Sequence, residues 1–190
     1  MKKFTELKQK INWWHILILL VIFISMMVCM RYTAAQVKKI SAGIAILDLN
    51  FGNSIEFIRQ TITLLGESAR NYYLTKFFVV DGFYSLTYAA FYAITLLFLF
   101  NKIGIKKKIV LCLPILPIIG MLFDWAENLS FGIAIKYWDI EITSLYVFGN
   151  ICTIIKFIFV YSSLFLVVSL LICFIVKCVK QKKESKNIDN

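Results

Sequence analysis

Four stretches of the sequence are long and apolar enough to cross a lipid bilayer as helices. We place these spans at about residues 13–30, 68–100, 109–130 and 151–176. A helix needs roughly 20 residues to cross about 30 Å of hydrocarbon, because each residue adds about 1.5 Å. Runs of this length satisfy their backbone hydrogen bonds in lipid only as α-helices. The pattern predicts an all-α fold, a four-helix transmembrane bundle that forms a single membrane domain over residues 1–190.

The composition also favours a membrane protein over a soluble one. Hydrophobic residues make up 60% of the chain and charged residues only 17%, whereas soluble domains have about 45–50% and about 25%. The first span is longer than the roughly 7–15 apolar residues of a signal peptide. We therefore expect it to be retained as a membrane helix.

Basic residues gather in three short segments that flank the spans. The net charge is +10, and 13 of the 21 lysines and arginines lie before the first span, between the second and third, and after the fourth. With four spans these segments share one side of the membrane, and excess positive charge marks the cytoplasmic side. We predict a multi-pass protein of a bacterial plasma membrane with both termini cytoplasmic, an outer loop over 31–67 and a cytoplasmic tail over 177–190.

The expected partners follow from the same charge distribution. Basic segments beside membrane helices favour contact with anionic membrane lipids. Basic grooves interleaved with aromatic residues, which nucleic-acid-binding proteins use, are absent from the sequence. We therefore predict membrane lipids as partners and no nucleic acid, while the oligomeric state stays open.

The outer loop contains a predicted helix. Asn53-Ser54-Ile55-Glu56 resembles a capping box in which Asn53 is the N-cap. Apolar residues then recur at helical spacing at Ile55, Ile58, Ile62 and Leu65. We expect a helix from Ser54 to Leu65 whose apolar face lies on the bundle or the membrane surface, and which stops at Gly66.

Polar residues within the spans are expected to meet at one depth. At about 1.5 Å per residue, Asp81 lies about 6 Å from the outer surface of the membrane, and Lys156 and Asp124 each lie about 8 Å from it. Ionisable residues inside a membrane almost always face the bundle interior and pair with one another. Helical spacing places further polar side chains on the same faces. We infer an outward-opening cluster of Asp81, Tyr84, Tyr88, Asp124, Glu127, Asn128 and Lys156, capped by Arg70 and Tyr73.

The residue types in this cluster suit ligand binding and proton transfer. Arg70 and Lys156 could hold a phosphate or carboxylate headgroup. Asp81, Asp124 and Glu127 are the candidate catalytic groups, because carboxylates held near a cation can act as general acids and bases. We expect the three acids to share a proton.

Several kinds of site do not fit the sequence. The only histidine, His15, lies a full membrane width from the cluster, which argues against Ser-His-Asp or Cys-His catalysis and against zinc. The five cysteines lie in or beside the spans and are interpreted as small apolar residues. Nucleotide-binding motifs do not occur. We predict no cofactor and no metal site, although divalent cation binding by the carboxylates stays open.

Short motifs also follow one another in a recognisable order. They are Asp48-Leu49-Asn50-Phe51-Gly52, then Gly66-Glu67-Ser68-Ala69-Arg70 with Tyr73, then Asp81 with Tyr88, then Asp124-x-x-Glu127-Asn128. Over about residues 13–176 this layout resembles a widespread group of uncharacterised four-span bacterial integral membrane proteins. The resemblance implies no activity, and it adds Asp48, Arg70 and Tyr73 as candidate ligand-binding residues.

Three functions remain open at this point. The first is a pocket that binds a lipid headgroup or a small polar ligand, with acid–base catalysis as an option, so whether the protein is an enzyme is undecided. The second is a structural or partner-binding membrane protein whose polar cluster only holds the helices together. The third is a proton- or ion-coupled transporter, which with four helices and no visible inverted repeat would have to form an oligomer.

Overall fold

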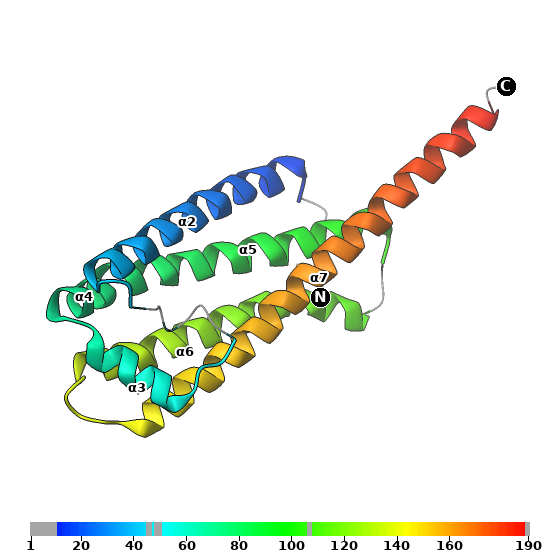
Figure 1. Ribbon diagram of the computed structural model, residues 1–190. Helices are drawn as coiled ribbons and strands as arrows, with labels where there is room; N and C mark the ends of the chain where they lie inside the picture. Colours follow the sequence, from blue (N-terminus) through cyan, green and yellow to red (C-terminus); the bar gives the residue numbers. More distant parts are fainter. Residues whose placement is uncertain (1–10, 45–46, 48–50, 106–107, 189–190) are drawn as a thin grey trace.

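The protein is an all-α four-helix bundle, as the sequence predicts (Figure 1). The computed structural model describes residues 11–44, 47, 51–105 and 108–188, with all side chains in these ranges except those of 108–111, 183 and 185–188. The long helices are α2 (Trp13–Ile40), α5 (Phe78–Ile103), α6 (Leu116–Lys136) and α7 (Thr143–Ile188). With the helical turns that precede α5 and α6, four segments are long and apolar enough to cross a membrane. These segments indicate a multi-pass membrane protein.

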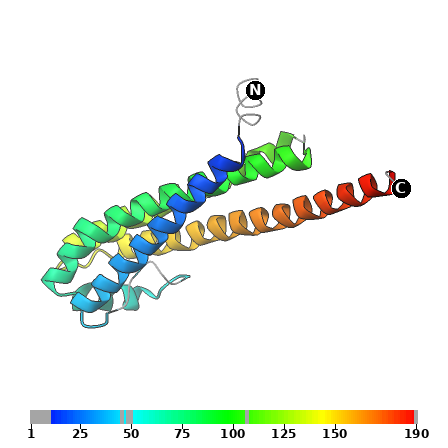
Figure 2. The same cartoon turned by 90° about the horizontal axis from the view of Figure 1, so that it is seen from above.

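The helix α5 lies at the centre of the bundle. It packs against α2, α6 and α7, while α6 and α7 also pack closely on each other. The two short helices α3 (Ile55–Leu64) and α4 (Glu67–Tyr72) lie at the opposite end from the start of α2 and the end of α7 (Figure 1 and Figure 2). We call this end, which also carries the turn 137–142, the loop end.

Two of the long helices continue well beyond the predicted spans. The helix α2 runs to Ile40, ten residues past the predicted end of the first span at residue 30, because no glycine or proline follows until Gly43. The helix α7 begins at Thr143 and includes the predicted tail as far as Ile188. Much of the predicted outer loop is therefore helical, and Arg31 belongs to α2.

The second span begins where the sequence predicts, near Ser68. The helix α4 starts at Glu67 and continues into α5 through one π-helical turn, η2 (Tyr73–Phe77). Before α6, the 3₁₀ segment η3 (Lys108–Ile115) contains Pro114. The 3₁₀ segment gives way to α-helix at Leu116.

The loop helix α3 is present, but the predicted cap is wrong by one residue. Ser54, not Asn53, is the N-cap, and its hydroxyl accepts a hydrogen bond from the backbone N–H of Phe57 at 3.1 Å. The Asn53 side chain instead donates to the carbonyl of Leu47 at 2.6 Å, and its backbone N–H donates to Asn150 Oδ1 on α7 at 2.7 Å. Asn53 therefore ties the loop to α7, a long-range contact that a local motif cannot reveal.

Two apolar cores stabilise the bundle. The loop-end core packs the buried face of α3 on the adjoining ends of the long helices and includes Met30, Ile58, Ile62, Tyr73, Phe77, Phe131 and Tyr146. The second core lies further along the helices and includes Tyr88, Tyr92, Leu96, Phe100, Met121 and Val167. On α5, α6 and α7, the buried residues between these two cores are mostly polar.

The ring of Phe131 on α6 packs directly on Gly149 of α7, which gives a test of the packing. A Cβ atom at this position would lie 2.6 Å from a ring carbon of the fully buried Phe131. We expect Gly149→Ala to destabilise the protein by about 1–3 kcal/mol, as overpacking does, and thermal unfolding in mild detergent measures this. The matched control is Gly132→Ala, where the nearest atom would be 3.5 Å away. Equal loss of stability in both variants would contradict this packing.

Candidate functional site

Lys156 and two carboxylates form the centre of the polar cluster. The Lys156 ammonium lies 2.6 Å from Glu127 Oε2 and 3.1 Å from Asp124 Oδ1. The acids are spaced i, i+3 on α6, so both face the lysine on α7. All three side chains are buried, with 0% to 6% of each residue exposed. Buried charges are tolerated when they are paired in this way.

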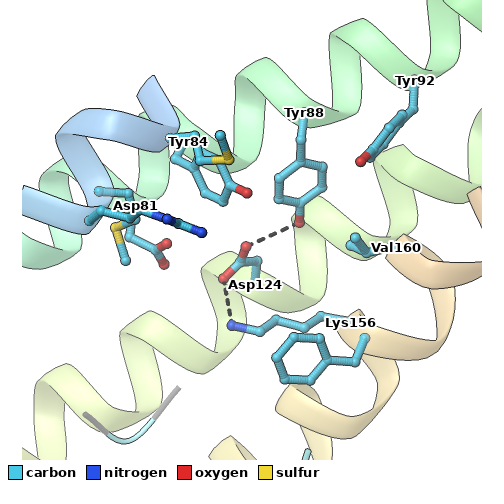
Figure 3. Close-up of a pocket in the computed structure, with 11 residues that line it drawn as sticks. Asp81, Tyr84, Tyr88, Tyr92, Asp124, Lys156 and Val160 are labelled. Atoms are coloured by element: carbon cyan, nitrogen blue, oxygen red, sulfur yellow. Dashed lines mark hydrogen bonds and ion pairs between the residues drawn. The ribbon is translucent and has the colours of Figure 1, made fainter. Parts of the chain in front are cut away.

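Hydrogen bonds extend this centre to a third helix. On α5, the Tyr88 hydroxyl donates to Asp124 Oδ2 at 3.1 Å (Figure 3). On α7, the Thr153 hydroxyl donates to Glu127 Oε1 at 2.8 Å. The network therefore runs from α5 through α6 to α7.

Asp81 joins the cluster through an amide. The Asn128 Nδ2 group donates to Asp81 Oδ2 at 2.6 Å, and both residues are buried. The Asn128 Oδ1 atom is buried too, and it has no hydrogen-bond partner within the described part of the chain. One turn further along α5, Trp125 Nε1 of α6 donates to Ser85 Oγ at 2.8 Å. These contacts hold α5 and α6 in one register, and so fix Asp81 beside Asn128.

A pocket of about 270 Å³ lies beside the cluster. In Figure 3, the side chains of α5 point toward Asp124 of α6 and Lys156 of α7. The charged residues of the wall are Arg31, Asp81, Asp124 and Lys156, the aromatic ones Tyr84, Tyr88, Tyr92 and Phe157, and the remaining ones Met27, Met30 and Val160. The wall therefore combines both signs of charge with aromatic and aliphatic surface.

The predicted site residues divide into three groups. The pocket wall contains Asp81, Tyr84, Tyr88, Asp124 and Lys156. Glu127 and Asn128 stand behind this wall and reach it through Lys156 and Asp81. Asp48 lies outside the described residues.

The predicted cap of Arg70 and Tyr73 is not found over the pocket. The Arg70 guanidinium lies 4.0 Å above the ring of Trp138 and donates to the carbonyl of Leu65. The Tyr73 ring is buried in the loop-end core, where its hydroxyl accepts from the backbone N–H of Leu47 at 3.2 Å. Both residues therefore stabilise the loop end, Arg70 from α4 through Trp138 of the turn 137–142 and Tyr73 from η2 through the core.

Sequence reasoning missed Arg31, Tyr92 and Thr153. Met27, Met30 and Arg31 are spaced i, i+3, i+4 and line the pocket from one face of α2. Continuing this helix to the next glycine would have revealed Arg31. Tyr92 follows Tyr88 by four residues and Thr153 precedes Lys156 by three, so both lie on faces that the sequence already marked as polar.

An exposed charged group at the loop end is separate from the pocket. Arg59 pairs with Glu56 at 2.9 Å and with Glu141 at 3.6 Å, which ties α3 to the turn before α7. Hydrogen bonds from the Arg59 side chain lower the pKa of the Glu56 carboxyl. Such exposed pairs contribute little to stability. Over the described ranges, no three His, Cys, Asp or Glu side chains are grouped so that they could hold a metal ion.

No protein-family model, curated protein or solved structure matches the chain. The resemblance to four-span bacterial membrane proteins therefore stays a prediction. The function of the chain has to be inferred from the geometry of the pocket.

Removing the central cation tests the cluster. We expect Lys156→Met to lower the free energy of unfolding by about 3–5 kcal/mol, because three buried carboxylates would lose their one buried counter-charge. Thermal unfolding of the purified protein in mild detergent measures this loss. The control is Lys136→Met, since Lys136 is an exposed lysine at the end of α6. A Lys156→Met protein as stable as the control would show that these ion pairs do not form.

Proposed function

We propose that the pocket binds a lipid headgroup or a small polar ligand. The observation that carries this proposal is the imbalance of buried charge. Among the described residues, the buried charged side chains are Asp81, Asp124, Glu127 and Lys156. Three negative charges and one positive charge give a formal sum of −2, more than is needed to hold three helices together. Charged residues inside membrane segments are costly and commonly mark binding or proton-transfer sites.

The proposal includes an orientation in the membrane. The basic segments favour the cytoplasmic side for both termini. The loop end would then face outward. Asp81 and Lys156 are closer to the loop end of their helical segments than to the other end, so the pocket would lie in the outer half of the bilayer.

Acid–base chemistry on the bound ligand would use Asp81 and Asp124. Both carboxylates line the pocket, whereas Glu127 contacts it only through Lys156. A general acid or base must come within hydrogen-bonding distance of the proton that it moves. Glu127 is therefore better placed to hold Lys156 in position.

A purely structural role is the second candidate. It is supported by the continuity of the hydrogen bonds from Tyr88 through Asp124 and Lys156 to Glu127, which join three helices. Polar contacts between membrane helices contribute about 0.6–2 kcal/mol. This role accounts for the network but not for Asp81, whose carboxylate adds negative charge to a centre that is already negative.

The two candidates differ in what the protein carries when it is purified. We expect native mass spectrometry of the protein in mild detergent to show a bound molecule. Asp81→Asn keeps the shape of the side chain but removes a charge from the wall. Because hydrogen bonds to charged groups contribute about 1.5–3 kcal/mol, the Kd should rise roughly tenfold or more, and the bound fraction should fall.

The matched control is Asp139→Asn, because Asp139 is exposed in the turn at the loop end. Gel filtration should show that both variants remain folded. A parent protein that carries no bound molecule, or equal occupancy in the parent and Asp81→Asn, would contradict ligand binding in the pocket.

A further inference from the structure

We propose that the ligand is a phospholipid whose headgroup carries both an ammonium and a phosphate, and that it enters sideways between α2 and α7. The ammonium would lie beside Asp81 and Asp124, and the phosphate at Arg31. This inference rests on the proposed binding function and names the class of ligand.

The charges of the pocket wall are separated by depth. Asp81 and Asp124 are each only 3% exposed, whereas Arg31 is exposed. Lys156, the other cation of the wall, is held between Asp124 and Glu127. Excess negative charge therefore lies inside and positive charge at the mouth. A zwitterionic phospholipid has the complementary order, because its ammonium is at the tip and its phosphate is next to the glycerol.

The inner wall has the chemistry that recognises an ammonium group. Carboxylates attract it, and the faces of aromatic rings attract it through cation–π contact. Tyr84, Tyr88, Tyr92 and Phe157 line the pocket, and the Lys156 ammonium already lies 5.4 Å from the centre of the Phe157 ring. Behind this wall, Asn128 donates to Asp81 and holds that carboxylate in place.

The packing of the helices is consistent with entry between α2 and α7, which do not pack closely on each other over the described residues. The helix α2 packs on α5, while α7 packs on α6 and α5. Met27 on α2 and Val160 on α7 both line the pocket, so its wall spans two helices that each pack on α5. Toward the loop end the way is covered, because Met30 of the wall belongs to the loop-end core and the Phe51 ring lies 6.0 Å from the Phe157 ring.

The volume fits a headgroup and not a whole lipid. Pockets that enclose a drug-sized molecule have about 300–1,000 Å³, and this pocket has about 270 Å³. The acyl chains would remain outside, along apolar residues that α2 and α7 expose, such as Ile24, Val28, Ile158 and Phe165.

Thermal unfolding of the purified full chain in mild detergent tests the inference with three probes. They are a phospholipid with a phosphoethanolamine headgroup, one with a phosphoglycerol headgroup and the same acyl chains, and water-soluble glycerophosphoethanolamine. At about a hundred times its Kd, the first should raise the midpoint by roughly 5–10 °C, and the other two should have much smaller effects.

Variants of pocket residues test whether the rise in the unfolding midpoint comes from binding in the pocket. Asp81→Asn should weaken binding of the phosphoethanolamine lipid because it removes a carboxylate that contacts the ammonium. Arg31→Gln should weaken binding of the same lipid because it removes the cation that contacts the phosphate. Their matched controls, Asp139→Asn and Arg59→Gln, change exposed loop-end residues and should keep the full shift. Because Arg31 is exposed, its variant should fold even if Asp81→Asn does not.

Four outcomes would overturn the inference. Equal stabilisation by the phosphoglycerol lipid would exclude recognition of the ammonium, and equal stabilisation by the soluble compound would exclude the lipid as the source. A full shift in Arg31→Gln would exclude the phosphate contact. A molecule of other chemistry found in the pocket by mass spectrometry would overturn this inference alone and leave the proposed binding function standing.

Discussion

The ion pairs of Lys156 with Asp124 and Glu127 are the contacts on which the rest of the polar region depends. A lone ammonium or carboxylate at this depth would be costly, and removing one partner leaves the other unpaired. The pairs therefore fix the register of α6 against α7. The hydrogen bond from Tyr88 to Asp124 then places α5. Because α5 carries Asp81 and the tyrosines, the shape of the pocket follows from this arrangement.

Much of this could be predicted from sequence, because it depends on helix periodicity and length. The spacing of Asp124, Glu127 and Asn128 placed them on one face, and counting residues placed Asp81 and Lys156 at a similar depth. The misplaced predictions depended on tertiary contacts. Arg70 stacks on Trp138, a residue from a distant turn that no local spacing indicates. Tyr73 is drawn into the loop-end core, and Asn53 bonds to α7 instead of capping its own helix.

The net charge of the cluster distinguishes a ligand-binding role from a purely structural one. A cluster selected only to hold helices together would balance its charges, whereas this one buries three acids with one base. The lysine is already shared by Asp124 and Glu127, so the two acids of the wall, Asp81 and Asp124, give the interior of the pocket its negative character. Arg31 gives its mouth the opposite sign. A ligand with two charges in that order would complete the site.

The most direct measurement of this account is the thermal stability of Asp81→Asn beside the parent protein and Glu127→Gln, all without ligand. Glu127→Gln removes a partner of Lys156 and should melt below the parent. Asp81→Asn keeps the shape of the side chain and reduces the excess negative charge. If the excess is maintained for function, Asp81→Asn should melt at or above the temperature of the parent, since functional sites commonly cost stability. If Asp81→Asn melts as far below the parent as Glu127→Gln, Asp81 stabilises the bundle, and the central claim that the acids form a binding site would be contradicted.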